Sequence, residues 1–461
     1  MKKKIRKRQL LAVAMVAALL APQGVYAAED SVDLSAQEAG RSAQEMEEMV
    51  LTSDEVNEEY MLGQNDKSAA ADFVEFLSTD KETKDILEDQ QQEAKNPLSV
   101  EKITDGTSLL EILQYTDETE TAGKNYVLAN DIIITETEYS QLTTGSDTPR
   151  VFAGTFDGDN HTITVEGDGG PLFEVLRGSV SNLKLVFEGD VTGAPFAIDA
   201  GAEDNQTGIT LENINVEVQG NILPTAHDYS QYYGSLLAPP YNYGNWYIHY
   251  GGEAQHLATG FAWYLWGASA EDVSVTVNGN VGTTDRLDGD TTATGFAYFA
   301  AQGDALDAVK YENISVDVTG DIQSYTGDGH ASAYGFAVGN SDSSAGFGCN
   351  TLEEFSNVTV YAENIIADSE QGSSSAFGMA RYLQGYTHDC EVNVKNEIKA
   401  VNEEGDAEED VYAYSNGDAY AYGFMLNTGG WSIDSRRNFE NNTVNVGAIT
   451  ARLTMFIAKE Q

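Results

Sequence analysis

The sequence predicts an all-β chain that folds as a β-solenoid, a stack of short parallel strands. The main observation is a ten-residue pattern in which apolar and polar residues alternate before a break at Gly-Asn or Gly-Asp. Four clear copies begin at Asn182 (NLKLVFEGDV), Asn213 (NINVEVQGNI), Asp272 (DVSVTVNGNV) and Asn313 (NISVDVTGDI). Weaker copies begin at Asn357, Glu391 and Thr443. Because each copy reads as one half-buried strand, the recurrence predicts layers that stack and bury a continuous core.

A second recurring segment supports the same fold. Between the ten-residue copies, a Gly is followed by a large apolar residue and flanked by Ala. The five segments are centred on Gly260-Phe261, Gly295-Phe296, Gly335-Phe336, Gly378-Met379 and Gly423-Phe424. The small residues allow close stacking of layers, so we expect the large side chains to fill the interior.

Two positions of the ten-residue pattern carry conformational predictions. Three Gly residues follow the alternating strand, and we expect positive φ there, with Asn364 at the same position in a later copy. These are Gly220, Gly279 and Gly320. Asn heads four copies, and we expect these residues to form a ladder of side-chain hydrogen bonds between layers. The ladder residues are Asn182, Asn213, Asn313 and Asn357.

The first 97 residues differ from the rest of the chain. Residues 1–27 combine a basic start, an apolar run and small residues before the cut, which predicts a cleaved bacterial export signal and a secreted or cell-surface location. The apolar run is too short to span a membrane, and we expect no membrane span after cleavage. Residues 28–97 are acidic and predict short helices or partial disorder. We assign residues 98–461 to the solenoid.

A short amphipathic helix is predicted at the start of the solenoid, over residues 108–115. Ser108 and Glu111 have capping-box spacing, and the residues between and after them are mostly apolar. A stack of layers exposes apolar ends, so we expect this helix to cover the first layer. The strand predicted after it, over residues 126–134, begins the solenoid.

The charge of the chain excludes several classes of partner. The sequence has 74 acidic and 25 basic residues, a formal charge of −49, and signal cleavage would remove six basic residues and no acidic one. We therefore expect no binding to nucleic acid or to anionic lipid. Asp-Gly turns at Asp157, Asp288 and Asp328 have oxygen ligands that suit Ca²⁺. Ordinary turn chemistry explains the same residues, so the sequence predicts no required cofactor.

The two cysteines leave a pairing open. Cys349 and Cys390 lie about one repeat apart, and in an exported protein this spacing permits a disulfide between neighbouring layers. The two residues sit at different positions relative to the ten-residue pattern. Free thiols therefore fit the sequence equally well.

One stretch near the start of the solenoid resembles a known family. The residues that carry the resemblance are Tyr126 to Ile132 (YVLANDI), Phe152 to Ile163 (FAGTFDGDNHTI), Leu172-Phe173 and Val180 to Leu185 (VSNLKL). Together, over about residues 123–187, they look like the GLUG-motif repeats of bacterial surface proteins. The resemblance implies that the solenoid is a right-handed parallel β-helix. Some members of the family belong to immunoglobulin-cleaving metalloproteases, but this chain contains no HExxH motif.

The largest insertion between repeats, residues 225–255, holds the candidate binding residues. Tyr and Trp give a large contact area with a polar group at the edge, which suits sugar rings or a protein surface. The candidates are Tyr232, Tyr233, Tyr241, Tyr243, Trp246, Tyr247 and Tyr250. Trp263 and Trp266 follow in the next segment and would extend the patch unless one is buried. A loop packed on itself explains the same residues equally well.

Three function classes remain after these exclusions. We expect an exported cell-surface protein that acts as an adhesin-like, glycan- or protein-binding solenoid, and not an enzyme. The alternative is a polysaccharide lyase or hydrolase, for which Arg286, Arg381, Arg436 and Arg437 are among the few basic residues that could stabilise a uronate. No catalytic constellation stands out in the sequence. A structural stalk of a larger surface protein is the third class.

Overall fold

The computed structural model describes the chain from residue 100 onward, with gaps. The described residues are 100–143, 149–201, 208–227, 255–301, 309–339, 354–383, 385–403, 419–427 and 439–454. The chain divides into two units, Met1–Pro97 and Leu98–Gln461, and all described residues belong to the second. The predicted export signal (residues 1–27) and acidic segment (residues 28–97) lie outside them and stay predictions.

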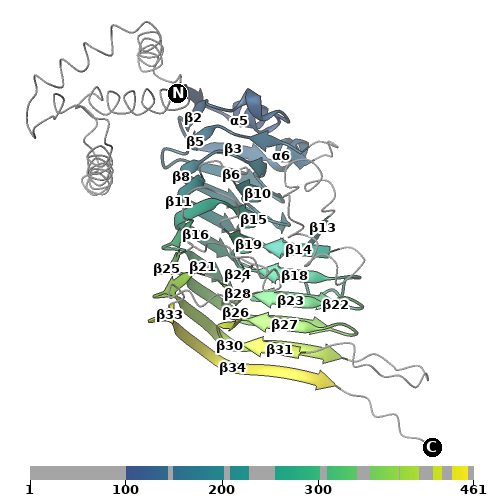
Figure 1. The fold of residues 1–461 in the computed structure, drawn as a ribbon. Coiled ribbons are helices and arrows are strands. Elements are labelled where there is room, and N and C mark those ends of the chain that lie inside the picture. Colours follow the sequence, from purple (N-terminus) through teal and green to yellow (C-terminus); the bar gives the residue numbers. More distant parts are fainter. Residues whose placement is uncertain are drawn as a thin grey trace, which may run out of the picture. The chain divides into compact units, whose positions relative to one another are not determined.

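The described residues form three sheets, which confirms the predicted all-β class (Figure 1). The first sheet contains β1 (Val100–Ile103), β2 (Asn125–Leu128), β3 (Ile132–Thr135), β5 (Thr155–Asp157), β6 (Thr162–Glu166), β8 (Val180–Phe187), β9 (Val191–Thr192), β11 (Ile209–Val218), β12 (Ile222–Leu223), β16 (Ala268–Val277), β17 (Val281–Gly282), β20 (Lys310–Glu312), β21 (Ser315–Val318), β22 (Asp321–Thr326), β25 (Glu354–Ser356), β26 (Thr359–Ser369), β29 (Tyr386–His388), β30 (Glu391–Glu403), β33 (Phe439–Glu440) and β34 (Thr443–Thr454). The second contains β4 (Val151–Phe152), β7 (Phe173–Leu176), β10 (Ala197–Gly201), β15 (Ala262–Trp266), β19 (Ala297–Ala301), β24 (Ala337–Gly339), β28 (Ala380–Tyr382) and β32 (Met425–Asn427). The third contains β13 (Thr225–His227), β14 (Gln255–Thr259), β18 (Thr291–Thr294), β23 (Ala331–Tyr334), β27 (Ser374–Phe377) and β31 (Ala419–Tyr422).

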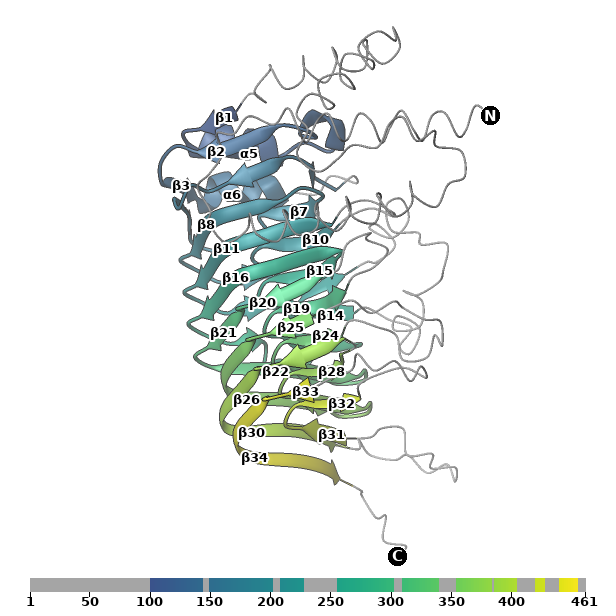
Figure 2. The same cartoon turned by 60° about the vertical axis from the view of Figure 1, so that its left-hand side comes forward.

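From β14 onward the chain passes through the three sheets in a fixed order and returns one strand further along. From β16 and β17 in the first sheet it runs to β18 in the third, β19 in the second, and back to β20 in the first. We call one such passage a layer. Val275 pairs with Val216 in the layer before and with Val316 in the layer after, so equivalent residues of the repeat lie in register. Figure 2 shows the resulting row of parallel strands.

The residues that head the repeats adopt the left-handed conformation and form the predicted ladder. The φ angle is 53° at Asn182, 52° at Asn213, 55° at Asn313 and 53° at Asn357. The amide of Asn213 donates to Oδ1 of Asn182 at 2.9 Å, and that of Asn357 donates to Oδ1 of Asn313 at 2.7 Å. Asn tolerates this backbone better than most residues, and its amide both donates and accepts, so one residue type meets both demands.

The two weakest repeat copies begin two residues earlier than expected. The left-handed residues of these layers are Asp389 and Asn441, not Glu391 and Thr443. Val392 pairs with Val360, so Cys390 takes the interior position that Val358 has in the layer before. The predicted start was wrong because Cys390 and Asn442 interrupt the apolar alternation that marks the other copies.

The prediction of positive φ at Gly220, Gly279 and Gly320 was also wrong. None of the three is among the left-handed residues. They are glycines because they stack: a Cβ on Gly279 would lie 2.6 Å from the carbonyl oxygen of Gly220, and one on Gly320 would lie 2.8 Å from that of Gly279. Asn364 does not take their position, since it pairs with Asp321.

The interior holds the large side chains of four of the five Gly-Phe and Gly-Met segments, as expected, while Phe424 in the last segment is partly buried. Phe196, Phe261, Phe296 and Phe336, which we call the Phe column, are fully buried. Ring centroids are 4.4 Å apart between Phe196 and Phe261, then 5.0 Å and 4.9 Å along the column, and the rings are nearly parallel. The Gly residues sit between layers, where a Cβ on Gly295 would lie 2.0 Å from the carbonyl oxygen of Gly335. Glycine is therefore required here for close approach.

Two helices cover the first layers. Helix α5 (Gly106–Leu113) begins two residues before the predicted start, because Asp105 is the N-cap and Ser108 is the third helical residue of the capping box. Its apolar side is buried as expected, and it contacts β3, β4 and α6 (Glu136–Thr143), a helix that the sequence did not predict. The expected strand over residues 126–134 is two strands, β2 and β3, and β1 precedes them. No helix among the described residues is long and apolar enough to cross a membrane.

Candidate functional site

The Tyr- and Trp-rich insertion begins and ends in a short antiparallel pair. Strand β13 pairs with β14 through Thr225 and Leu257, Ala226 and His256, and His227 and Gln255. The two ends of the insertion are therefore held side by side at the edge of the third sheet. The predicted binding residues Tyr232, Tyr233, Tyr241, Tyr243, Trp246, Tyr247 and Tyr250 lie outside the described residues, so their role stays a prediction.

Trp263 does not extend an exposed aromatic patch. It is 3% exposed and belongs to a second buried cluster, separate from the main core, with Leu257, Tyr298, Tyr334 and Phe377. The expectation that one of the two tryptophans is buried is confirmed at this residue. The side chain of Trp266 lies outside the described part of the chain.

The Asp-Gly turns use their carboxylates as hydrogen-bond acceptors. Oδ1 of Asp157 accepts from the backbone N–H of Asp159 at 2.9 Å, and Oδ1 of Asp328 accepts from that of Gly289 at 2.6 Å. Within the described residues no group of three or more His, Cys, Asp or Glu side chains is placed to hold a metal ion. The carboxylate of Asp157 thus accepts within its own turn, and that of Asp328 accepts from the neighbouring layer.

Cys390 is buried and has no disulfide partner among the described residues. Its Sγ donates to the carbonyl oxygen of His388 at 3.3 Å, and burial raises the pKa of the thiol to about 11. The thiol is therefore protonated and unreactive at neutral pH. Cys349 lies outside the described residues, so the pairing of the two cysteines stays a prediction.

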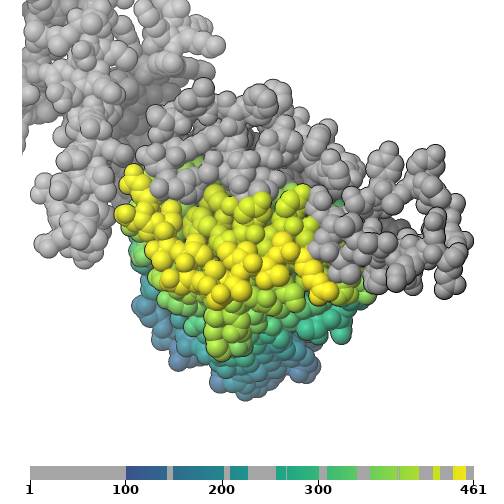
Figure 3. Space-filling model, turned by 90° about the horizontal axis from the view of Figure 1, so that it is seen from below, coloured from purple at the N-terminus to yellow at the C-terminus, as the bar shows by residue number. Residues whose placement is uncertain are grey.

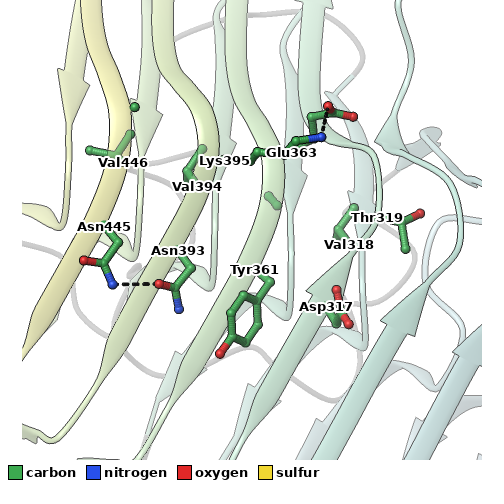
Figure 4. A pocket seen from close by; sticks show the side chains of 12 residues that line it. Asp317, Val318, Thr319, Tyr361, Glu363, Asn393, Val394, Lys395, Asn445 and Val446 are labelled. Atoms are coloured by element: carbon green, nitrogen blue, oxygen red, sulfur yellow. Dashed lines mark hydrogen bonds and ion pairs between the residues drawn. The ribbon is translucent and has the colours of Figure 1, made fainter.

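A groove crosses the outer face of the first sheet near its C-terminal end (Figure 4). Its volume is about 530 Å³, and it is lined by residues 317–319, 361–363, 393–395 and 445–447. These come from β21, β26, β30 and β34, which are adjacent strands of successive layers. At the usual strand spacing the groove spans about 14 Å across the strands.

The polar side of the groove is one row of equivalent residues. Asp317 pairs with Tyr361, Tyr361 with Asn393, and Asn393 with Asn445. With Glu217 and Thr276 at the same position in earlier layers, these residues form what we call the outer row. Alternation along each strand turns them away from the core, and Tyr361 is 43% exposed. Figure 4 shows the four side chains side by side.

Hydrogen bonds fix the side chains around Tyr361. The amide of Asn445 donates to Oδ1 of Asn393 at 2.8 Å and to Oε1 of Glu391 at 3.1 Å. At the other side of the groove, Nζ of Lys395 donates to Oε1 of Glu363 at 2.8 Å. This bond and the charge of Lys395 lower the pKa of the Glu363 carboxyl, so the pair is ionised at neutral pH. Nδ2 of Asn393 is buried and has no hydrogen-bond partner.

The groove residues were not predicted from the sequence. All of them lie in the recurring strands, whose copies we interpreted as structural. The aligned repeats contain one hint of the groove. At the position of the outer row, Glu217, Thr276 and Asp317 are followed by an aromatic residue, Tyr361. Tyr361 is the only aromatic residue among the described members of this row, which has apolar residues at Ile133 and Val186 in the first layers.

A second polar cluster surrounds Arg286, one of the basic residues singled out from the sequence. Its Nη2 lies 3.0 Å from Oδ1 of Asp368 and 3.2 Å from Oε2 of Glu403, and its Nε lies 3.0 Å from Oε1 of Glu370. Burial raises the pKa of the Asp368 carboxyl, although Arg286 opposes the shift. Of the other basic residues, Arg436 and Arg437 lie outside the described residues, and Arg381 is in β28.

No known relative helps to interpret the groove or the cluster around Arg286. No protein-family model matches the chain, and comparison with curated proteins and with solved structures finds no significant similarity.

Proposed function

We propose that this chain is an exported bacterial cell-surface protein, a right-handed parallel β-helix of the GLUG-repeat type, which binds glycans through the groove around Tyr361. The observation that carries the proposal is an exposed tyrosine ring held among amide and carboxylate side chains on a rigid row of strands. The parallel, in-register layers support the β-helix, and the resemblance at residues 123–187 supports its hand.

A sugar ring presents an apolar C–H face and an edge of hydroxyl groups. An exposed Tyr ring offers a flat apolar surface, and its own hydroxyl remains available for a hydrogen bond. Asn393 and Asp317 flank the ring, and the carboxylate of Asp317 supplies acceptors that hydroxyl groups need. The groove crosses four strands, so it suits an extended chain of sugars rather than a single ring.

The charge of the groove selects among glycans. Asp317 and Glu363 are acidic, and the only basic residue among its lining residues, Lys395, is already paired with Glu363. The whole chain is strongly acidic. Uronic acids and sulfated sugars are therefore repelled, and neutral or amine-bearing glycans are favoured. The Tyr- and Trp-rich insertion, residues 225–255, provides a second contact in this proposal.

A glycan array tests the proposal with matched variants. The wild-type chain is expected to be retained on neutral or amino-sugar polysaccharides, and Tyr361→Ala to lose retention at least tenfold. Tyr386→Ala is the control, because Tyr386 is a partly exposed tyrosine on β29 of the same sheet. Absence of wild-type retention on every array would overturn the proposal. An equal loss of retention in Tyr361→Ala and Tyr386→Ala would show that Tyr361 has no specific role in binding.

A second candidate function is polysaccharide hydrolysis, which the cluster around Arg286 favours. Asp368 has a raised pKa beside other carboxylates, and glycoside hydrolysis needs one protonated and one ionised carboxyl group. A lyase is less well supported, since Arg286 is already bound by three carboxylates and is not free for a uronate. New reducing ends from neutral polysaccharides, lost in Asp368→Asn, would favour this function over binding alone.

A further inference from the structure

One carboxylate of the outer row has no partner among the residues that the structure describes. Asp317 is exposed, and it makes no hydrogen bond or ion pair with any of them. By contrast, Oε2 of Glu217 in the same row lies 3.1 Å from Nζ of Lys184. The neighbours of Asp317 along the row are Thr276 and Tyr361, and neither is basic. The negative charge of Asp317 is therefore available to a ligand.

The ring of Tyr361 lies directly beside this carboxylate. Asp317 and Tyr361 are in register on β21 and β26, which are adjacent parallel strands. Neighbouring strands are about 4.8 Å apart, and residues in register point to the same face of the sheet. Figure 4 shows the carboxylate and the ring next to each other in the groove, whereas Figure 3 views the stack from below, onto β34. A ligand group above the ring can therefore also reach the carboxylate.

The positive charge of the groove is already balanced. Lys395 is the only basic residue among the lining residues, and its Nζ lies 2.8 Å from Oε1 of Glu363. With this pair neutral, the lining keeps one net negative charge, on Asp317. An ammonium group of a ligand is thus attracted to the part of the groove that also holds the exposed ring.

We propose that the glycan bound in the groove carries free amino groups, and that one ammonium group lies over the Tyr361 ring and against the Asp317 carboxylate. This inference rests on the proposed glycan function and narrows it to amino sugars without an acetyl group. An aromatic ring attracts an ammonium group within about 6 Å of its centroid, and the carboxylate adds an ion pair. Acetylation of the amine removes its charge, so both attractions are lost while the sugar ring stays the same.

A lysine-rich peptide would offer the same ammonium group, but the rest of the groove suits a sugar better. Thr319, Lys395 and Asn445 are exposed and polar, so they can meet hydroxyl groups. Val318 and Val394 are buried and offer no apolar surface to the methylene stem of a lysine side chain.

Isothermal titration calorimetry of the chain with a glucosamine tetrasaccharide and its fully N-acetylated form tests the inference. In a mildly acidic buffer that keeps the amines protonated, the wild type is expected to bind the free-amine form about tenfold more tightly. Asp317→Asn, which keeps the side-chain size, should weaken binding of that form about fivefold and leave the acetylated form unchanged. Glu212→Gln is the matched control, because Glu212 is an exposed carboxylate on β11 outside the groove. It is expected to bind as the wild type does, which separates Asp317 from the overall charge of −49.

Tyr361→Ala should weaken binding of both forms, because the ring is the surface that they share. Equal wild-type affinity for the two forms, or equal losses in Asp317→Asn and Glu212→Gln, would overturn this inference and leave the proposed function standing. Binding of neither form would do the same if a neutral polysaccharide is retained on the array, and would overturn both if no glycan is retained. Trilysine bound more tightly than the free-amine sugar would assign the groove to a basic peptide and overturn the inference.

Discussion

The Phe column and the outer row are two series of equivalent residues on the same set of layers, and they differ in how much they vary. Inside, the residue is Phe in four consecutive layers, and each ring stacks on the next. Outside, the residue is Glu217, Thr276, Asp317, Tyr361 and then Asn393. Backbone hydrogen bonds between neighbouring layers hold each series in register, those between the Phe residues themselves inside and those of the first sheet outside.

The difference teaches where to look for function in a repeated fold. An interior ring must match the shape of its neighbours above and below, so packing dictates the residue type. An outer side chain meets only solvent and its neighbours in the row, so packing leaves it free. A departure from the repeat pattern on the outer face, such as Tyr361, therefore points to a ligand more strongly than any repeated aromatic residue does.

The largest effect on stability is expected in the Phe column. Phe296→Ala removes a fully buried ring that stacks on Phe261 and Phe336, and the cavity and lost transfer free energy should cost about 3–5 kcal/mol. Chemical denaturation gives the free energy of unfolding. A loss below that of an average surface substitution would show that the column is not what holds the layers together.

An intermediate effect is expected in the ladder of head residues. The amide of Asn313 donates to Oδ1 of Asp272 at 3.0 Å, and its Oδ1 accepts from Asn357 at 2.7 Å. Asn313→Gly should cost about 1 kcal/mol through the lost hydrogen bonds, and Asn313→Ala about 2 kcal/mol because Ala also resists positive φ. If both variants lose the same free energy of unfolding, the left-handed backbone at Asn313 does not contribute to the difference predicted for Ala.

A smaller effect, visible as pH dependence, is expected at His388. Its ring lies 2.7 Å from Oδ2 of Asp389 and 3.1 Å from Oε1 of Glu354, and these contacts, first the bond to Asp389, raise the pKa of the imidazole above 6.5. The raised pKa means that this stabilisation is complete below pH 6.5 and is lost as the pH rises through the folded-state value. Thermal melts should therefore show a midpoint that falls with rising pH in this range. His388→Asn should flatten the slope, and an unchanged slope would contradict this assignment.

Substitutions in the outer row are expected to have the smallest effect on stability. In the proposed function they have the largest effect on glycan binding. Tyr361→Ala should change the free energy of unfolding by no more than about 0.5 kcal/mol, as for other surface residues. Tyr361→Phe should keep most glycan retention, because stacking depends on the ring. If Tyr361→Ala destabilises the chain as much as Phe296→Ala does, the contrast between the two series fails.

Much of the fold could be predicted from particular residues, and the misses have physical causes. The buried Phe296 and the ladder through Asn313 were predicted because both recur in fixed order. Gly320 was misjudged, since a Gly required for close approach looks the same in sequence as one required for positive φ. The start at Asp389 was missed because Cys390 replaces the apolar residue that marks the position in other layers.

The groove could not be predicted, because nothing local connects its residues. Asp317, Tyr361 and Asn445 belong to different repeats, and only their register across β21, β26 and β34 brings them into one row. The same holds for Arg286, whose three carboxylate partners come from later strands and the turn that follows one of them. Such groupings depend on loop lengths between layers, which the pattern of apolar residues does not encode.

By itself the sequence determined the all-β class, the interior rings and the side-chain ladder of the Asn heads, since alternation and small residues act within one repeat or between neighbouring copies. The tertiary structure decided which outer side chains share a groove and which carboxylates surround Arg286. Both depend on the register and closure of whole layers, where residues distant along the chain are set side by side by the backbone ladders.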